Sequence, residues 1–479
     1  MEDYRSFNAV RQDLEQKKIT CVDLVQHYVL KINATKDLNA FIEVFEESAK
    51  EKAQKVDLKI KNGTAGKLAG LILSIKDNIC YKGHGVSAAS KILENFESIY
   101  NATVVERLLE EDAIIIGRTN CDEFAMGSSN ENSFYGAVKH PFIEGKVPGG
   151  SSGGAAASVA AGLCMAALGS DTGGSVRQPA SFCGLVGFKP TYGRISRYGL
   201  IAYASSFDSI GCFTNTIEDT ALILEVIAGK DDFDSTLSIK EVTNYSKKIV
   251  SNSSAKMTLA VFKNYIENPA LDPEVKKRIL SIITDLESEG HTIKRINFDW
   301  INQMIPVYYA LTTAEASTNL SRYDGVHFGY RSQNAIDLES TYVKSRSEGF
   351  GAEVKRRILL GTHILSEDNY ENYYLKAQKV RRLIRDDTKK ILKDCDFIIH
   401  STTPHAAFDR NAMHKDPIQM YLEDIYTVHA NIVGLPAISL PLGKTEKNHP
   451  FGIQLMTDSF KEEKLLSFSN YLMENFGCE

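Results

Sequence analysis

The sequence lacks any apolar run long enough to cross a membrane. Its longest run of small apolar residues, 155–168, is interrupted by Ser158 and Gly162, whereas a spanning helix needs about 20 apolar residues. The N-terminal stretch carries acidic residues and no apolar segment of the kind found in secretory signals. Basic and acidic residues nearly balance, 55 against 61, so the whole chain has no nucleic-acid-binding footprint. These absences predict a cytoplasmic protein without membrane association.

Two further kinds of site find little support. The eight cysteines include no Cys-x-x-Cys pair, which argues against zinc and predicts reduced, buried thiols. The glycine-rich block at 148–162 also lacks the Gly-Lys-Ser/Thr ending of a phosphate loop. It has no internal repeat, no low-complexity tail and no obvious linker. We therefore expect one large domain over residues 1–479, with no metal and no cofactor bound by this chain.

What the sequence does contain is an alternation of helical and strand-like segments. The first 60 residues favour helices, because Thr20 to Asp23 resembles a capping box and residues 45–62 end at Gly63, a common C-terminal cap. Apolar runs at 68–79 and 113–120 are typical of buried strands. This alternation predicts an α/β fold with a central mixed, largely parallel sheet covered by helices on both faces.

The same patterns continue through the second half. Strands are predicted at 257–262, 291–296, 396–402 and 436–442, and helices at 216–228 and 273–289. The third quarter is mainly helical, and its segment 350–393 is rich in lysine and arginine. Solvated helix faces are a better explanation of that charge than a binding patch.

Lys76 is the first residue that suggests chemistry. It follows the apolar strand of "LSIKDN", and lysine is rarely buried at such a position unless it is paired or functional. Burial would lower its pKa and allow it to act as a neutral base. The alternative is a lysine at the end of the strand with its ammonium in water, and this segment alone favours neither.

A glycine- and serine-rich block, "PGGSSGGAAASVAAG" (148–162), follows. It formally matches the Gly-x-Ser-x-Gly nucleophile elbow with Ser152 in the nucleophile position, but that motif needs a strand before it. The preceding "FIEGKVPGG" is a poor strand, so we reject the elbow. The glycines instead allow the backbone to approach a substrate or another loop.

The loop "GSDTGGSVRQPASFCG" places Ser175 behind two glycines. Backbone N–H groups at a glycine turn and a helix start can converge on one point, as an oxyanion hole requires. A nucleophilic serine usually has a histidine base, and none occurs in this stretch. A serine can also lose its proton through a second serine, Ser151 or Ser152, to a neutral lysine such as Lys76. Asp171 and Arg177 are expected to pair and brace the loop.

These motifs, in this order, resemble the amidase signature family, whose triad is serine, serine and lysine. Ser151 and Lys76 lie 24 and 99 residues before Ser175, as in that family, and the signature covers about 70–215. The resemblance implies that Ser175 is the nucleophile, that Ser151 is the bridging serine behind a cis peptide bond, and that Lys76 is the base. It also implies that Ser152 is only a neighbour of the triad.

The resemblance further implies an oxyanion hole built from backbone N–H groups of Thr172, Gly173, Gly174 and Ser175. It is closest to the amidase subunits of tRNA-dependent amidotransferases, and it extends over nearly the whole length of the chain. The segments that carry it include "RTNCDEFAMGSSNENS", "AEASTNLSRYDGVHFGYR", "SEGFGAEVKRRILLGTH" and "YLEDIYTVHANIVGLPAISLP".

In those subunits the substrate is free glutamine, and the helical region at about 300–435 forms the glutamine pocket. Carried over, Asp424 would hold the α-ammonium of glutamine. Arg357, with Arg356 as the alternative, would hold the α-carboxylate. Tyr308, with Tyr309 as the alternative, would line the pocket. An aspartate and an arginine suit a buried zwitterion.

By the same resemblance, this chain would cut glutamine and pass ammonia to partner subunits. The partners would be the B and C subunits of a heterotrimer, with the B subunit binding Glu-tRNA(Gln) and using ATP and Mg²⁺. A stand-alone amidase acting on another small amide is the alternative, and a non-catalytic tRNA-binding subunit is a weaker one. One departure from the family is His429, which stands where a smaller apolar residue or a proline is expected, and we assign it no catalytic role.

Overall fold

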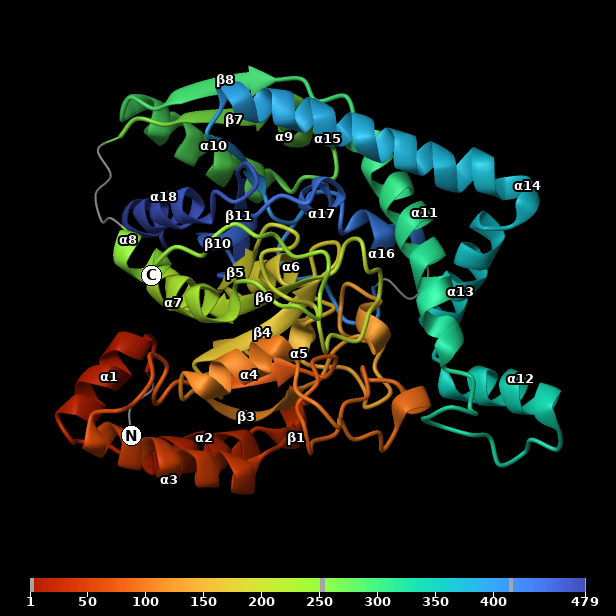
Figure 1. Ribbon diagram of the computed structural model, residues 1–479. Helices are drawn as coiled ribbons and strands as arrows, with labels where there is room; N and C mark the ends of the chain where they lie inside the picture. The colour runs from red at the N-terminus through yellow and green to blue at the C-terminus, as the bar shows by residue number, and fades with distance from the viewer. Residues whose placement is uncertain (1–3, 250–254, 413–416, 479) are drawn as a thin grey trace.

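The computed structural model describes residues 4–249, 255–412 and 417–478. Within them the chain forms an eleven-stranded sheet in the order β1-β3-β2-β4-β6-β5-β10-β11-β9-β7-β8 (Figure 1). The strands are β1 Phe41–Val44, β2 Ile72–Lys76, β3 Ile114–Thr119, β4 Ala166–Asp171, β5 Val186–Lys189, β6 Ser209–Thr214, β7 Thr258–Phe262, β8 Thr292–Ile296, β9 Phe397–Ser401, β10 Ala437–Lys444 and β11 Pro450–Met456.

The α-helices fall into two groups along the chain. The first group is α1 Phe7–Glu15, α2 Cys21–Ala34, α3 Glu46–Asn62, α4 Thr103–Glu110, α5 Gly153–Ala160, α6 Arg177–Cys183, α7 Ile217–Ile227, α8 Tyr245–Lys248, α9 Lys263–Ile266 and α10 Pro273–Ser288. The second group is α11 Ile301–Asn319, α12 Leu338–Gly349, α13 Ala352–Ile364, α14 Glu367–Asn369, α15 Lys376–Asp394, α16 Pro417–Leu422, α17 Val428–Val433 and α18 Glu462–Phe476.

The predicted α/β fold with a mixed sheet is confirmed, but the sheet is less parallel than expected. Among the described residues, four of the ten neighbouring strand pairs are parallel and six are antiparallel. The parallel pairs lie in two groups, β3-β2-β4 and β9-β7-β8, and the strands between them pair antiparallel. The sequence pattern recorded buried strands but carried no information about their direction.

Local sequence signals explain several elements. The capping box of α2 is present, because Asp23 N–H donates to Thr20 Oγ1 at 3.1 Å and Thr20 N–H donates to the Asp23 carboxylate at 2.9 Å. Helix α3 ends at Asn62, followed by Gly63 in the left-handed conformation with φ 69°. Strand β1 was not predicted, since its four residues are only partly buried and lie between two helices.

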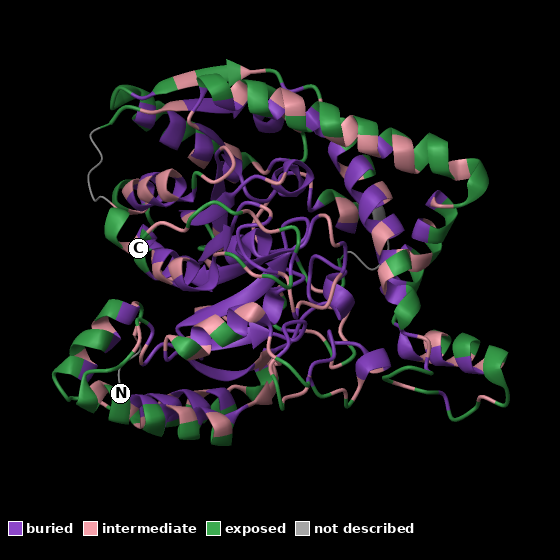
Figure 2. Cartoon of the chain, in the orientation of Figure 1, coloured by how far each residue is buried: buried purple, intermediate pink, exposed green. Residues whose placement is uncertain are grey.

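The parallel group β3-β2-β4 places several polar residues at the same edge of the sheet. Neighbouring parallel strands have their carboxyl ends at the same edge, where ligands of α/β proteins commonly bind. Lys76, Thr119 and Asp171 are the last residues of these strands. Figure 2 shows buried residues filling the central strands of the sheet and the helices next to them, with exposed residues along the edge strand β8 and along α3, α12 and α15.

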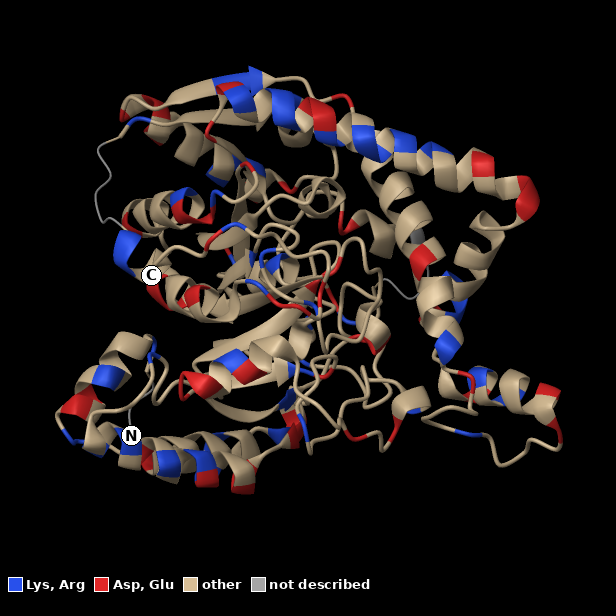
Figure 3. Ribbon diagram, viewed as in Figure 1, with Lys and Arg blue, Asp and Glu red and all other residues tan. Residues whose placement is uncertain are grey.

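Helices α11 to α15 form a helical extension beside the sheet (Figure 1). Helix α11 packs against α13 and α15, and α17 packs against α15 and α11. Figure 3 shows lysine and arginine residues along α15. Arg382 and Lys390 are largely exposed there, as solvated faces require. Arg357 of α13 is the contrasting case, because it is buried. No helix within the described residues combines the length and the apolar character that a membrane crossing requires.

Candidate active site

Lys76 ends β2, and its side chain is fully buried. Its Nζ donates hydrogen bonds to the hydroxyls of Ser151, Ser152 and Ser170 at 2.7, 2.9 and 3.0 Å. Burial lowers the pKa of the Lys76 ammonium to about 8, although nearby acidic groups act in the opposite direction. The interpretation with the ammonium in water is therefore wrong. An amine with this pKa is partly neutral near pH 7 and can accept a proton.

Ser151 and Ser152 lie in the loop before α5, and both hydroxyls contact Lys76. The peptide bond between Gly150 and Ser151 is cis. The Ser152 hydroxyl donates its hydrogen to the carbonyl oxygen of Ser170 at 3.2 Å. Among the residues that the structure describes, Lys76 is the one hydrogen-bond partner of the Ser151 hydroxyl. The two serines therefore differ, since the Ser152 hydrogen is already bonded and the Ser151 hydrogen is available.

No strand precedes this loop in residues 142–150, which agrees with the rejection of the elbow motif. Helix α5 begins directly after the two serines, at Gly153. The loop is held by its neighbours, because Gly150 N–H donates to the Gln178 side-chain oxygen at 2.9 Å and Asp122 N–H donates to the Ser151 carbonyl at 3.0 Å. The bonds to Asp122 and Gln178 keep the serine loop in place beside Lys76.

Ser175 stands between the glycine pair and α6, with 8% of its surface exposed. Its carbonyl oxygen accepts a hydrogen bond from Ser152 N–H at 3.2 Å, which joins the two serine loops. Its hydroxyl makes no hydrogen bond with any residue that the structure describes. The expected bond between the Ser151 and Ser175 hydroxyls is therefore not formed here. Hydrogen bonds of catalytic groups often tighten only when substrate is bound.

The loop between β4 and α6 is organised by the Asp171 carboxylate. It accepts backbone hydrogen bonds from Gly174 at 2.9 Å, Val176 at 3.2 Å and Arg177 at 3.4 Å. The Arg177 guanidinium adds two more, from Nη2 at 2.9 Å and Nε at 3.0 Å. The predicted pairing of Asp171 with Arg177 is thus confirmed, and it fixes the backbone around Ser175.

This arrangement divides the backbone donors that the sequence analysis assigned to an oxyanion hole. The N–H of Gly174 donates to Asp171 and is occupied. The N–H groups of Thr172, Gly173 and Ser175 have no acceptor among the described residues. Only these three are therefore free in the structure to bind a developing negative charge.

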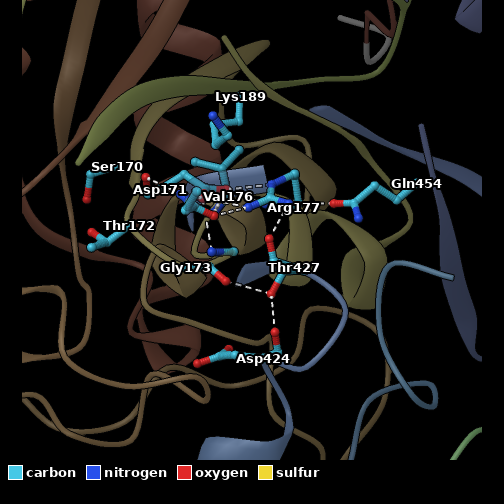
Figure 4. Close-up of polar contacts among 12 residues, drawn as sticks. Ser170, Asp171, Thr172, Gly173, Val176, Arg177, Lys189, Asp424, Thr427 and Gln454 are labelled. Atoms are coloured by element: carbon cyan, nitrogen blue, oxygen red, sulfur yellow. Dashed lines mark hydrogen bonds and ion pairs between the residues drawn. The ribbon is translucent and has the colours of Figure 1, made fainter. Parts of the chain in front are cut away.

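Arg177 continues the network beyond the loop, as Figure 4 shows. It is fully buried, and its Nη1 donates to the carbonyl oxygen of Thr427 at 2.9 Å and to the Gln454 side-chain oxygen at 2.5 Å. Its Nη2 also donates to the Asn431 side-chain oxygen at 2.6 Å. Burial alone would raise the pKa of Asp171, but the charge and hydrogen bonds of Arg177 hold it at about 2.

Replacing Arg177 is expected to destabilise the fold strongly. In Arg177→Met the Asp171 carboxylate would stay buried without its cation, and breaking such a pair costs about 3–5 kcal/mol of unfolding free energy. Urea unfolding followed by circular dichroism measures the loss. Arg356→Gln is the control, because its side chain is half-exposed and its partner Glu353 keeps the ion pair with Arg357, and we expect a change within about 0.5 kcal/mol. Equal stability of Arg177→Met and the unchanged protein would contradict this account.

Asp424 lies in the turn between α16 and α17, with 8% of its surface exposed. Its carboxylate accepts hydrogen bonds from the Ser128 hydroxyl at 3.0 Å and the Tyr309 hydroxyl at 3.2 Å. Burial raises the pKa of Asp424 to about 7. A cation bound beside it would favour the ionised carboxylate.

Arg357 and Arg356 point to different environments. Arg357 is 2% exposed, and it donates to Glu353 at 2.8 Å and to the Tyr203 hydroxyl at 2.9 Å. Its guanidinium also lies 5.2 Å from the centre of the Tyr309 ring. Arg356 pairs with Glu353 from the solvent side. Of the two arginines, Arg357 is therefore the one that shares a buried cluster with the partners of Asp424.

Tyr308 and Tyr309 are adjacent in α11 but contact different parts of the site. Tyr309 contacts Asp424 and Arg357. Tyr308 instead lies against the glycine pair, because a Cβ added to Gly173 would come within 2.5 Å of the Tyr308 hydroxyl. The sequence analysis preferred Tyr308 over Tyr309 as the pocket residue. In the structure it is Tyr309 that contacts Asp424.

Several residues of the site were not found from the sequence. Ser128 lies in a motif that was noticed, but its hydroxyl contact with Asp424 crosses almost 300 residues of chain. Ser170, Glu353 and Thr427 also lie in quoted segments, but nothing in those segments singled them out, and Tyr203 lies outside them. His429 is fully buried and bonds Thr388 at 2.8 Å. Burial lowers the pKa of His429 to about 3, so it remains neutral.

A buried lysine among serine hydroxyls, next to a glycine loop at the edge of an α/β sheet, defines a serine–lysine hydrolase type of site. Among the described residues no cluster of histidine, cysteine, aspartate and glutamate could hold a metal ion. The chain belongs to the amidase family, whose profile matches residues 23–466.

Named relatives agree with this assignment. The chain is 49% identical over 468 residues to the A subunit of the glutamyl-tRNA(Gln) amidotransferase of Chlorobium limicola, covering 98% of each sequence. It is similar to the crystal structure of the corresponding A subunit from Thermotoga maritima, with TM-score 0.78 and 37% identity over 97% of this chain and 95% of that one. A 6-aminohexanoate cyclic dimer hydrolase shares the fold, with TM-score 0.85 at 21% identity over 100% and 98% of the two chains.

Proposed function

We propose that this chain is the glutaminase subunit of a glutamyl-tRNA(Gln) amidotransferase. It hydrolyses glutamine through Ser175, Ser151 and Lys76 and supplies the ammonia that converts Glu-tRNA(Gln) to Gln-tRNA(Gln). The observation that carries the proposal is the Lys76 hydroxyl cluster together with a buried aspartate and arginine, in a chain half identical to such subunits over nearly its full length.

The reaction begins with proton transfer. Neutral Lys76 takes the hydrogen of Ser151, and Ser151 takes that of Ser175 as the Ser175 oxygen attacks the side-chain amide carbon of glutamine. The availability of the Ser151 hydrogen, in contrast to that of Ser152, supports this route. The free N–H groups of Thr172, Gly173 and Ser175 would stabilise the oxyanion, which is usually a large part of catalysis.

The second half returns the protons. The protonated Lys76 gives its proton, through Ser151, to the departing nitrogen, and ammonia leaves as the C–N bond breaks. A glutamyl ester then remains on Ser175. Water attacks the ester with the same lysine as base, which releases glutamate and restores the Ser175 hydroxyl. Proton transfers of this kind contribute about 10²–10⁴-fold to a rate.

Substrate selection is assigned to the second cluster. Asp424 would bind the α-ammonium of glutamine and Arg357 its α-carboxylate, with Tyr309 between them and Tyr308 against the glycine loop. The inward orientation of Arg357 supports its choice over Arg356. An arginine fork suits a carboxylate because it can form two parallel hydrogen bonds.

The remaining steps belong to other chains. The ammonia would pass to a B subunit that binds Glu-tRNA(Gln) and activates its glutamate with ATP and Mg²⁺, in a cytoplasmic heterotrimer completed by a C subunit. The names of the relatives support this assembly. We propose no cofactor for this chain itself.

The proposal is tested on the full chain purified with the proteins that accompany it from its host. We expect glutamine hydrolysis together with glutamine-dependent, ATP-dependent formation of Gln-tRNA(Gln). In Arg357→Gln the KM for glutamine should rise by about 10- to 100-fold, since a buried charge-assisted bond contributes about 1.5–3 kcal/mol. Ammonia release and tRNA amidation are measured separately.

The matched control is Arg356→Gln, whose KM should stay within about twofold because its side chain is half-exposed and Glu353 keeps its pair with Arg357. Equal effects of the two substitutions would contradict the assigned pocket. Hydrolysis of apolar amides in preference to glutamine, with no accompanying proteins and no tRNA amidation, would instead identify a stand-alone amidase.

A further inference from the structure

The turn that carries Asp424 also contacts the loop of Ser175, through Thr427 (Figure 4). The Thr427 hydroxyl donates to the carbonyl oxygen of Gly173 at 2.6 Å, and the carbonyl oxygen of Asp424 lies 3.1 Å from the same hydroxyl. Thr427 N–H donates to that Asp424 carbonyl at 3.0 Å. One fully buried side chain thus joins the proposed ammonium anchor to the glycine pair.

The contact is close as well as polar. A Cβ added to Gly174 would lie 2.2 Å from Thr427 Oγ1, so Thr427 fits only against a glycine. The carbonyl oxygen of Thr427 accepts a hydrogen bond from Arg177 at 2.9 Å. Arg177 in turn holds Asp171, which bonds Gly174 N–H. Thr427 therefore contacts the loop directly through its hydroxyl and indirectly through its backbone.

We propose that Thr427 is a positioning residue that couples binding of the substrate amino group at Asp424 to the shape of the oxyanion loop. The inference rests on the proposed glutaminase function. Because the Thr427 hydroxyl bonds Gly173 O, it sets the orientation of the peptide plane between Gly173 and Gly174. The free N–H groups of Gly173 and Ser175 flank that plane, so a small rotation would misalign them.

A second connection runs in parallel from the same carboxylate. Tyr309 donates to Asp424, and the adjacent Tyr308 lies against Gly173. An ammonium bound at Asp424 is thus linked to Gly173 along two routes, one through α11 and one through Thr427. The consequence is selectivity in the chemical step: an amide that lacks the α-amino group would react slowly even when it is bound.

The test compares two substrates on three variants of the full chain with its accompanying proteins. The substrates are glutamine and glutaramate, which is glutamine without its α-amino group. Thr427→Val removes the hydroxyl and keeps the shape, whereas Thr427→Ser keeps the hydroxyl. Thr220→Val is the matched control, since Thr220 is a buried threonine of α7 that also bonds a backbone carbonyl, that of Thr216. Ammonia release yields kcat and KM for each pair.

We expect Thr427→Val to lower kcat for glutamine by about tenfold, the equivalent of one hydrogen bond. Its KM for glutamine should change by less than about twofold, and its kcat for glutaramate should fall by clearly less than the kcat for glutamine, because the part of the effect that depends on the amino group is absent. Thr427→Ser should restore kcat for glutamine, and Thr220→Val should leave both kcat values unchanged.

Equal losses of kcat for both substrates in Thr427→Val would overturn the inference, because a general packing defect acts on any substrate. No loss for either substrate, or no recovery in Thr427→Ser, would overturn it as well. Failure of the unchanged protein to hydrolyse glutamine would refute the proposed function instead, which separates the two outcomes.

Discussion

Ser175→Ala is expected to abolish glutamine hydrolysis and to leave ammonia-driven amidation of Glu-tRNA(Gln) intact. The substitution removes the oxygen that we propose forms the glutamyl ester, and loss of a serine nucleophile lowers kcat by about 10⁴- to 10⁶-fold. The alanine lacks only one hydroxyl, which makes no hydrogen bond with the described residues, so folding should be unaffected. Ammonia release and Gln-tRNA(Gln) formation with added ammonium are the two measurements.

Ser152→Ala is the matched comparison, because Ser152 also contacts Lys76 but its hydrogen is bonded to the Ser170 carbonyl. It should retain far more activity than Ser151→Ala or Ser175→Ala. Loss of both glutamine- and ammonia-driven amidation in Ser175→Ala would contradict the division of labour between this chain and its partners. Full glutaminase activity in that variant would refute Ser175 as nucleophile.

Replacement of Lys76 should have the second largest effect. Lys76→Met leaves an unbranched apolar side chain that is one atom shorter and lacks the amine, so we expect kcat to fall by at least about 10³-fold, near the upper range for a general base. The unchanged protein should also respond to pH. Burial lowers the pKa of Lys76 to about 8, and only the neutral amine accepts a proton. Therefore kcat/KM for glutamine should rise with pH and level off above that value.

Lys189 provides a stringent control for this pH profile. It is also fully buried, and burial lowers its pKa to about 7. Its Nζ, however, donates to the Pro190 carbonyl at 2.8 Å and touches none of the serines. Lys189→Met should keep the rise near pH 8 even if the protein is less stable. A profile that moves in Lys189→Met, or one that is flat from about pH 6.5 to 9 in the unchanged protein, would contradict the role of Lys76.

The fold could be predicted from sequence where the signal is local. The capping box of α2, the end of α3 at Gly63 and the buried strands β2, β3, β9 and β10 all follow from patterns within a few residues. Strand direction could not be predicted, because pairing joins segments far apart in the chain. Strand β1 was missed because four partly buried residues carry too little periodicity.

The same distinction applies to the site. Lys76, Ser151 and Ser175 lie in motifs whose spacing is visible in the sequence. The choice between Arg356 and Arg357 required the structure, because adjacent residues of a helix point in different directions and only burial separates them. The sequence also could not predict that the N–H of Gly174 is occupied, since this depends on the orientation of the Asp171 carboxylate.

The location of the two clusters bears on how such a protein can diverge. Lys76 and the Ser175 loop belong to strand ends and to short loops pinned by Asp171, whereas Arg357 and Tyr309 stand on helices of the extension. Mutations in those helices can therefore change substrate binding without disturbing Lys76 or the loop of Ser175. The hydroxyl of Thr427 limits this divergence. Any change of substrate preference must leave its hydrogen bond to Gly173 in place.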